Sequence, residues 1–227
     1  MRLNWQVREE HPRLLLFFNG WGMDERLLGM VEPPAGRDLL VVYDYTDLQG
    51  ADAVRAAVAH YPAADLVAWS MGVWAAATVF AGPPGALFGK AVAVNGTGRP
   101  IDDEYGIPAS LFHATLDNFS ERARDSFFRR MCDGRDACGD FLPHAPLRDV
   151  EDQRRELCAL ALYAGEGVQP PGPFTSAVVG SRDRIMPPAN QMRYWQGVVP
   201  CRTVKLPHLP FSRRTGWREI LGETDEP

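Results

Sequence analysis

The sequence predicts an α/β fold, with a mostly parallel central sheet, helices on both faces and a helical insertion. Short, nearly continuous apolar runs recur along the chain and are typical of strands buried on both faces of a parallel sheet. Segments with helical spacing alternate with these runs, as in a layered α/β domain. Residues 99–172 lack such runs, so we expect a core of residues 1–98 and 173–227 interrupted by a helical lid insertion of residues 99–172.

The strands and helices can be assigned in chain order from these patterns. Six apolar runs are expected to form strands: 13–18, 39–45, 65–69, 90–95, 174–180 and 201–206. Four segments of the core are expected to be helical: 51–61, 73–80, 188–198 and 211–221. Within the insertion we expect helices at 110–118, 121–131 and 150–163, separated by Gly134, Gly139 and Pro143. Residues 24–30 can also start a helix before Pro33 and Pro34 end it.

Composition and charge restrict the class of protein. The 227 residues are 45% hydrophobic and 23% charged, which is ordinary for a globular protein. A formal net charge of −5 argues against general affinity for nucleic acid. No apolar run is long enough to span a bilayer, and the first residues lack the apolar stretch of a signal peptide. The four cysteines have no metal-ligand spacing, so we expect free thiols in a reducing, cytoplasmic environment. We also expect a monomer.

The stretch around Ser70 carries the strongest chemical signal. An apolar strand ends at Ser70, small residues stand two places before and after it (Ala68 and Gly72), and an alanine-rich helix follows. This arrangement is the nucleophile elbow of the α/β-hydrolases, in which a sharp turn exposes the serine hydroxyl at the sheet edge. The usual pattern is G-x-S-x-G, and here Ala68 replaces the first glycine. We therefore predict that Ser70 is a nucleophile.

A serine nucleophile needs a base and a carboxylate that orients the base. In this fold they follow in the order serine, acid, histidine. His208 comes just after the last predicted strand and is the expected base, whereas the other two downstream histidines lie in the insertion. Asp183 follows the preceding strand and is the expected acid. Asp44 and Asp47 are the alternatives if Asp183 does not fill that role.

Ester hydrolysis also needs hydrogen-bond donors for the oxyanion. One donor is usually the backbone N–H after the nucleophile, and a second comes from the loop after an early strand. We therefore predict the N–H groups of Met71 and Trp21. Trp21 lies in an Asn-Gly-Trp-Gly turn, whose glycines let the backbone approach a substrate closely.

With these residues placed, the chain resembles the BioG family of pimeloyl-[acyl-carrier protein] methyl ester esterases. The matching stretches are residues 15–24 (LLFFNGWGMD), 43–45 (YDY) and 68–73 (AWSMGV). The resemblance covers the core and weakens in the insertion. It implies an enzyme that hydrolyses the methyl ester of a pimeloyl chain on acyl-carrier protein, which frees the carboxylate for biotin synthesis. It implies no metal or organic cofactor.

The resemblance also suggests roles for the insertion. BioH-type esterases have the same activity and a helical lid that contacts substrate through a phenylalanine and the residues after it. Residues 126–131 (SFFRRM) resemble that segment, which implies substrate contact by Phe127, Phe128, Arg129, Arg130 and Met131. Acyl-carrier proteins are acidic, so we expect docking to a basic face formed by Arg122, Arg124, Arg129 and Arg130. The phenylalanines can instead be ordinary lid packing, and the arginines can instead pair with neighbouring carboxylates.

Two other functions remain open from the sequence. The same serine, histidine and aspartate would serve a thioesterase or a general short-chain carboxylesterase. A catalytically inactive hydrolase used as a binding module is a different class, against which the complete set of catalytic candidates argues. Lid chemistry is the one sequence feature that separates the two enzyme readings.

Overall fold

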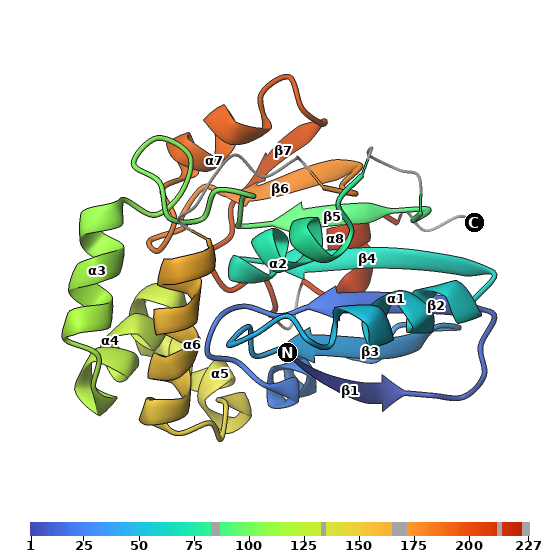
Figure 1. Ribbon diagram of the computed structural model, residues 1–227, viewed down its shortest axis with the longest axis horizontal. Coiled ribbons are helices and arrows are strands. Elements are labelled where there is room, and N and C mark those ends of the chain that lie inside the picture. The colour runs from blue at the N-terminus through green and yellow to red at the C-terminus, as the bar shows by residue number, and fades with distance from the viewer. Residues whose placement is uncertain (83–86, 133–134, 165–171, 213–214, 224–227) are drawn as a thin grey trace.

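The central feature of the protein is a seven-stranded sheet in the order β1-β3-β2-β4-β5-β6-β7. The computed structural model describes residues 1–82, 87–132, 135–164, 172–212 and 215–223. Within them the strands are β1 (Arg2–Val7), β2 (Arg13–Phe18), β3 (Asp38–Tyr43), β4 (Ala63–Trp69), β5 (Ala91–Val94), β6 (Ser176–Gly180) and β7 (Cys201–Val204). All neighbouring pairs are parallel except β1 with β3. The predicted mostly parallel sheet is therefore confirmed (Figure 1).

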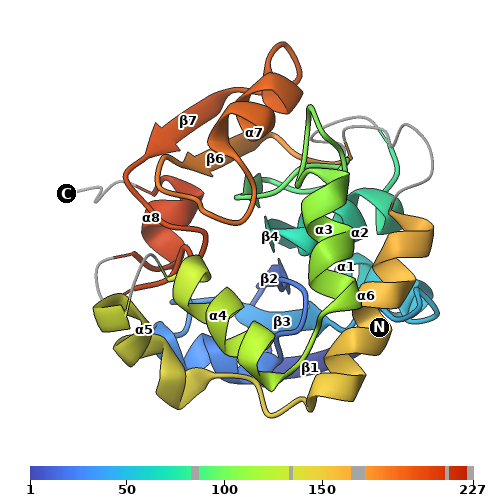
Figure 2. The same ribbon diagram turned by 90° about the vertical axis from the view of Figure 1, so that its left-hand side faces the viewer.

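The apolar runs became strands because both faces of the sheet are covered. Every residue of β3 and β5 is buried, as are all residues of β2 and β4 except the first. Helices α1 (Ala51–His60) and α2 (Met71–Val79) lie on one face, and α8 (Trp217–Leu221) lies on the other (Figures 1 and 2). Helix α7 (Pro188–Trp195) packs on β6. Burial on both faces removes the alternation of polar and apolar residues that a half-exposed strand would show.

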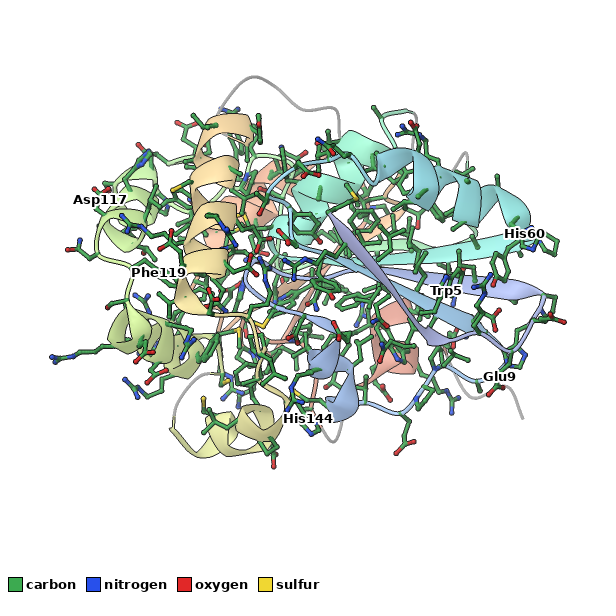
Figure 3. All side chains as sticks on the ribbon, turned by 60° about the horizontal axis from the view of Figure 1, so that its bottom comes forward. Trp5, Glu9, His60, Asp117, Phe119 and His144 are labelled. Carbon is green, nitrogen blue, oxygen red and sulfur yellow. The ribbon has the colours of Figure 1, made fainter. Side chains whose placement is uncertain are left out.

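The sequence analysis did not predict strand β1, which the structure adds to the six predicted strands. Its residues alternate between polar and apolar, with Leu3, Trp5 and Val7 on one side, which is the pattern of an edge strand covered on one face. It pairs antiparallel to β3, and the Trp5 ring packs on Tyr61 after α1. In Figure 3 Trp5 and His60 lie close together, at the end of the molecule opposite Phe119.

The helix predicted over 211–221 begins later in the structure than expected. Helix α8 begins only at Trp217, because Gly216 N–H is capped by the Glu219 carboxylate at 2.8 Å. Phe211 precedes the helix and packs its ring against those of Phe17 and Trp217. Residues 213–214 lie outside the described residues. The C-terminal segment thus anchors itself to the sheet by aromatic packing.

Helices from the predicted insertion gather beyond one end of the sheet (Figure 1). They are α3 (Ala109–Asp117), α4 (Glu121–Met131), α5 (Arg135–Phe141) and α6 (Val150–Tyr163), with a short 3₁₀ segment at Leu142–His144. A second 3₁₀ segment, Glu25–Met30, lies outside the insertion, where the sequence allowed a helix to start. The sequence did not predict α5, because Gly139 is a weak helix former. Ser120 and Asp149 cap α4 and α6 by accepting hydrogen bonds from backbone N–H groups in the first turns. Residues 165–171 of the proposed insertion lie outside the described residues.

The parallel strands bring their carboxyl ends to the edge that these helices cover. Trp69, Gly180 and Val204 are the last residues of β4, β6 and β7, so Ser70, Asp183 and His208 all follow strands that end at this edge. No helix among the described residues has the length and apolar character needed to cross a membrane.

A buried aspartate ties the opposite edge together. Asp38 opens β3 and accepts hydrogen bonds from the Tyr61 hydroxyl at 2.6 Å and from the N–H groups of Glu9 and His11 at 2.9 and 3.3 Å. Burial alone would raise the pKa of Asp38, but these hydrogen bonds outweigh it and hold the pKa below its ordinary value. The ionised form therefore stabilises the folded state.

We expect Asp38→Asn to lower the melting temperature at pH 7, because its amide presents a donor to groups that are themselves donors. Since the folded pKa of Asp38 is depressed, its contribution is present at neutral pH and lost as the pH falls through that pKa. The difference in melting temperature between wild type and variant should therefore shrink below about pH 4. The exposed Asp52→Asn is the control; a gap for Asp38→Asn that stays constant down to pH 3 would contradict this account.

Candidate active site

Ser70 sits at the predicted sharp turn between β4 and α2. Its backbone adopts φ 58° and ψ −124°, a strained conformation that non-glycine residues adopt rarely. A Cβ on Gly72 would come within 2.5 Å of the carbonyl oxygens of Phe18 and Asn19, so only glycine fits there. Gly96 is equally constrained, because its Cβ would lie 2.4 Å from the Ser70 carbonyl oxygen. Ala68 is fully buried, so the methyl group at the first position of the elbow is accommodated.

A chain of hydrogen bonds joins the three residues that the sequence singled out. His208 Nε2 lies 2.9 Å from Ser70 Oγ, and His208 Nδ1 lies 2.8 Å from Asp183 Oδ2. With the carboxylate as acceptor, Nδ1 carries the proton and Nε2 is left to accept from the serine hydroxyl. All three side chains are buried. This is the arrangement of a nucleophile, a general base and an orienting acid.

The Asp183 carboxylate is held on both oxygens. Oδ1 accepts hydrogen bonds from the N–H groups of Ile185 and Met186 at 2.8 and 2.9 Å. Oδ2 accepts from Gln191 Nε2 at 2.8 Å as well as from His208. Gln191, on α7, carries no signal in the sequence that would have marked it. With so many donors, the carboxylate cannot rotate without losing hydrogen bonds, so its orientation toward the histidine is fixed.

The alternative acids are engaged elsewhere. Asp44 accepts from the Thr46 hydroxyl and forms ion pairs with Arg2 and Arg148. Asp47 binds the N-terminal amine at 2.9 Å. Both carboxylates are thus bound to other groups, and Asp183, whose Oδ2 lies 2.8 Å from His208 Nδ1, remains the preferred acid.

The loop that carries His208 is fixed through its own backbone. The His208 carbonyl accepts hydrogen bonds from Trp69 Nε1 at 2.7 Å and from Asn95 Nδ2 at 2.8 Å. Asn95 Oδ1 also accepts from Gly180 N–H at 2.6 Å, at the end of the strand that leads to Asp183. Asn95 thus braces the histidine loop against the acid strand. Sequence reasoning missed it, although an asparagine directly after a strand, here at φ 47°, is a turn signal.

The backbone donors of the early loop can be assigned by elimination. Gly20 N–H donates to Asn19 Oδ1, Gly22 N–H to Glu156 Oε2 and Met23 N–H to the Gly20 carbonyl. Among the described residues, no partner is found for the Trp21 N–H. The Met71 N–H is in the first turn of α2. The first N–H groups of a helix have no hydrogen-bond partner within the helix. The two N–H groups that the sequence predicted are thus available to a ligand.

A small apolar pocket of about 20 Å³ lies over Ser70. Phe127 and Met131 of α4 line it, together with Gly20, Trp21, Trp69, Ser70, Met71, Ile107, Ile185 and His208. The Trp21 ring packs edge-on against Phe127 and Phe119, and its Nε1 donates to the Gln153 carbonyl at 3.0 Å. Of the predicted substrate contacts, Phe128 instead packs against Phe141, and Arg129 and Arg130 are exposed outside this lining. This volume holds about one water molecule, so the pocket is nearly closed.

The arginines of α4 divide between two sides of the helix. Arg122, Arg129 and Arg130 are exposed, and among the described residues they make no ion pair. Arg124 points toward the buried side, with 24% of its side chain exposed, and lies 3.9 Å from Asp125. Arg124 is therefore separated from the exposed basic face that the other three arginines form.

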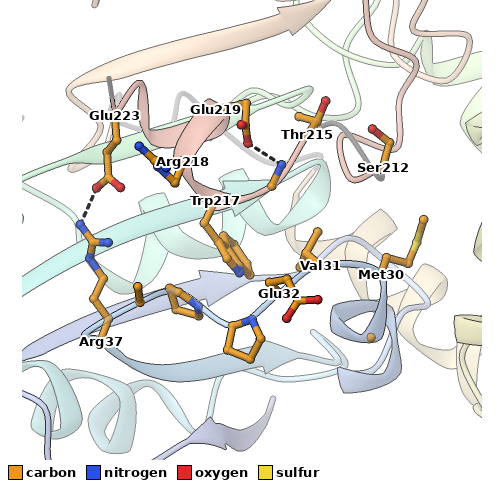
Figure 4. Close-up of a pocket in the computed structure, with 15 residues that line it drawn as sticks. Met30, Val31, Glu32, Arg37, Ser212, Thr215, Trp217, Arg218, Glu219 and Glu223 are labelled. Atoms are coloured by element: carbon orange, nitrogen blue, oxygen red, sulfur yellow. Dashed lines mark hydrogen bonds and ion pairs between the residues drawn. The ribbon is translucent and has the colours of Figure 1, made fainter. Parts of the chain in front are cut away.

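A separate pocket of about 700 Å³ lies between residues 29–37 and α8 (Figure 4). Trp217 forms part of its wall, and Arg37 at its rim is paired with Glu223 and with Asp65. None of the three residues joined by hydrogen bonds lines it, so it is distinct from the candidate active site. No group of three or more metal-ligating side chains occurs within the described part of the chain.

Comparison with known proteins identifies the family. A family model described as pimeloyl-ACP methyl esterase BioG matches residues 3–220. The chain belongs to the BioG family. The resemblance inferred from the sequence is therefore confirmed, and with it the carboxylic ester hydrolase class and the link to biotin synthesis at the level of the family.

Individual relatives are similar over most of the chain. The crystal structure of BioG from Haemophilus influenzae superposes with a TM-score of 0.86 at 34% identity, covering 97% of this chain and 100% of that one. An uncharacterized protein of Haemophilus influenzae is 39% identical over 217 residues, which is 95% of this chain and 96% of that protein. A malonyl-[acyl-carrier protein] O-methyltransferase of Bacteroides fragilis is 43% identical over 185 residues, which is 80% of this chain. This BioG chain covers only 36% of the length of that methyltransferase.

More distant structures show the fold alone. An esterase from Exiguobacterium antarcticum has a TM-score of 0.67 at 12% identity, with 91% of this chain and 87% of that chain covered. A putative aryl esterase from Burkholderia cenocepacia has a TM-score of 0.63 at 13% identity, with 92% and 87% covered. Together with the sheet order, they confirm the α/β-hydrolase fold.

We expect Asp183→Asn to reduce ester hydrolysis by about 10⁴-fold, because the amide donates toward His208 Nδ1 and stabilises the wrong tautomer. The turnover number on a small ester would be measured with the melting temperature as a check on folding. Asp47→Asn is the matched control and should remain within a few-fold of wild type. Near-normal activity of Asp183→Asn, with a large loss in Asp44→Asn or Asp47→Asn, would show that the acid is misassigned.

Proposed function

We propose that this BioG protein is a serine esterase that hydrolyses the methyl ester of a pimeloyl chain carried by acyl-carrier protein, in the cytoplasm and as a monomer. The observation that carries the proposal is the continuous set of hydrogen bonds from Ser70 through His208 to Asp183, beneath an apolar pocket. Membership of the BioG family supplies the substrate class. The reaction would free the terminal carboxylate for biotin synthesis.

The first half of the reaction uses the serine as a nucleophile. His208 Nε2 takes the hydroxyl proton as Ser70 Oγ attacks the ester carbonyl carbon. The carbonyl oxygen becomes an oxyanion, which the N–H groups of Trp21 and Met71 stabilise. When the tetrahedral intermediate collapses, the protonated histidine gives its proton to the departing methoxide. Methanol leaves and the acyl chain remains bonded to Ser70.

The second half returns the enzyme to its starting state. His208 takes a proton from water as the water attacks the acyl carbonyl carbon, and the same N–H groups stabilise the second oxyanion. Collapse breaks the bond to Ser70 Oγ, which recovers the proton from His208. The product is the free carboxylate. Asp183 stays ionised throughout and stabilises the imidazolium that forms twice in each cycle.

The pocket sets a requirement for substrate entry. Its volume of about 20 Å³ is smaller than the seven-carbon pimeloyl chain needs, and Phe127 and Met131 of α4 form part of its wall. The acyl chain therefore enters when α4 and its neighbours shift outward, in the manner of a lid. Phe127 and Met131 would then contact the apolar part of the chain, as the resemblance to the BioH lid implies.

The central test removes the nucleophile and the base in turn. Ser70→Ala and His208→Ala should each lower turnover by on the order of 10⁴-fold or more, because neither residue acts without the other. The assay would be methanol release from the carrier-bound ester, with fluorophosphonate labelling of Ser70 as a second measurement. Ser110→Ala and His113→Ala, at exposed positions of α3, are matched controls. Activity of Ser70→Ala or His208→Ala within tenfold of wild type would overturn the assignment.

The proposed carrier-protein surface is tested by charge reversal. Arg129→Glu with Arg130→Glu should lower kcat/KM on the carrier-bound ester, because charge attraction mainly accelerates association with an acidic partner. Hydrolysis of a short p-nitrophenyl ester should hardly change. Added salt should weaken the wild type on the carrier substrate and leave the double variant nearly insensitive.

Controls separate docking from damage to the lid. Arg8 lies over the Trp5 ring, at the opposite end of the molecule from α4. Arg8→Glu is therefore the matched control for the single variant Arg129→Glu. It should leave both substrates unaffected. Equal losses on both substrates would indicate a disturbed α4, and unchanged activity on the carrier substrate would remove these arginines from the docking surface.

A further inference from the structure

Helix α6 contacts the loop that carries Trp21 at three points. Glu156 Oε2 accepts a hydrogen bond from Gly22 N–H at 3.1 Å. Gln153 Nε2 donates to the Gly22 carbonyl at 2.8 Å, and the Gln153 carbonyl accepts from Trp21 Nε1 at 3.0 Å. The indole, and the N–H and carbonyl groups of the next residue, are thus all bound to one helix of the proposed insertion.

Glu156 is a fully buried carboxylate with donors on every side. Besides Gly22, it accepts from Tyr45 N–H at 2.9 Å and from Arg148 Nη1 at 2.6 Å. Burial raises the pKa of Glu156, and Arg148 and the two N–H groups oppose that effect. Because each neighbour is a donor, the site requires a carboxylate that accepts hydrogen bonds. Arg148 is held in turn by Asp152 at 2.7 Å and lies 3.4 Å from Asp44.

The loop needs such an external constraint. Gly22 has φ 74°, and a glycine resists rotation less than any other residue. Without Glu156, the Gly22 N–H would lose its partner, and the peptide after Trp21 would be free to turn. The peptide that carries the Trp21 N–H is held separately, because its Gly20 carbonyl accepts a hydrogen bond from Met23 N–H at 3.4 Å. The peptide before it is held by the bond from Gly20 N–H to Asn19 Oδ1. Glu156 and Gln153 therefore complete the set of bonds that fixes the Trp21 backbone on its C-terminal side.

We propose that Glu156 and Gln153 are positioning residues that hold the Trp21 N–H in the orientation needed to stabilise the oxyanion. The inference rests on the proposed esterase function, in which Trp21 is an oxyanion donor. It adds that α6 does more than cover the site: its buried carboxylate and amide contribute to turnover through the loop that they hold. Neither side chain touches the substrate.

The test is Glu156→Gln, which keeps the size of the side chain and removes its charge and one acceptor oxygen. We expect kcat on p-nitrophenyl acetate to fall by about 10²-fold, by comparison with loss of an oxyanion donor, while KM changes less than about threefold. Inhibition by a trifluoromethyl ketone, whose adduct with Ser70 carries an oxyanion, should weaken by a similar factor. Glu151→Gln, an exposed change on the same helix, should alter none of these values.

Active sites would be counted with a fluorophosphonate end-point, so that kcat refers to folded enzyme. A merely structural role would lower the melting temperature and leave kcat per active site and inhibitor affinity unchanged, which would overturn the proposal. If Glu156→Gln does not fold, Gln153→Met provides the test, because it removes only the donor to the Gly22 carbonyl. It should lower kcat about tenfold at unchanged KM, and wild-type kcat would overturn the proposal.

The same experiment separates this proposal from the esterase function itself. Ser70→Ala is assayed in parallel on the same ester. An inactive Ser70→Ala with a normal Glu156→Gln would reject the positioning role alone. A fully active Ser70→Ala would reject the esterase mechanism, and the inference with it.

Discussion

The strained turn at Ser70 is the constraint on which the rest of the site depends. A non-glycine residue at φ 58° and ψ −124° costs about 1–3 kcal/mol, which the surrounding packing must offset. The packing does so through close backbone approaches: the carbonyl groups of Phe18 and Asn19 leave room only for glycine at position 72, and the Ser70 carbonyl does the same at position 96. Because β2 and β5 flank β4, the ends of three adjacent strands set the position of a single hydroxyl group.

Two buried carboxylates extend that constraint outward. Asp183 orients His208, and Glu156 holds the loop of Trp21; both are surrounded by donors from backbone and side chains. A buried charge that keeps all its partners is tolerated, whereas removing one partner typically costs about 3–5 kcal/mol. The polar groups around the site are therefore coupled. A substitution in either set disturbs geometry as well as charge.

Much of the fold was predictable because its signals are local. Apolar runs marked β2 to β7, and the small residues around Ser70 marked the elbow. Strand β1 was missed although its alternation of polar and apolar residues was visible, because the apolar-run criterion finds only strands that are buried on both faces. The helix over 211–221 was placed too early, since the aromatic contacts of Phe211 involve a strand about 190 residues earlier in the chain. Such long-range packing overrides local helical spacing.

Within the candidate site, the three residues joined by hydrogen bonds were predictable, and those that hold them in place were not. Ser70, Asp183 and His208 follow strand ends in a fixed order, so topology places them. Asn95 and Glu156 act through bonds to backbone groups 85 to 134 positions away, and Gln191 of α7 binds Asp183, 8 positions earlier, so no short motif contains them. Their side chains are common polar types whose roles depend entirely on the partners that folding provides.

Helix α4 connects the proposed partner surface to the chemistry. Its buried face supplies Phe127 and Met131 to the pocket, and its exposed face carries Arg129 and Arg130. The Met131 carbonyl at its end accepts a hydrogen bond from Leu209 N–H, next to His208, at 3.0 Å. A carrier protein bound to the arginines would therefore press on the same helix that closes the pocket and supports the histidine loop. Docking and opening of the pocket would then be mechanically linked, because both act through one rigid element.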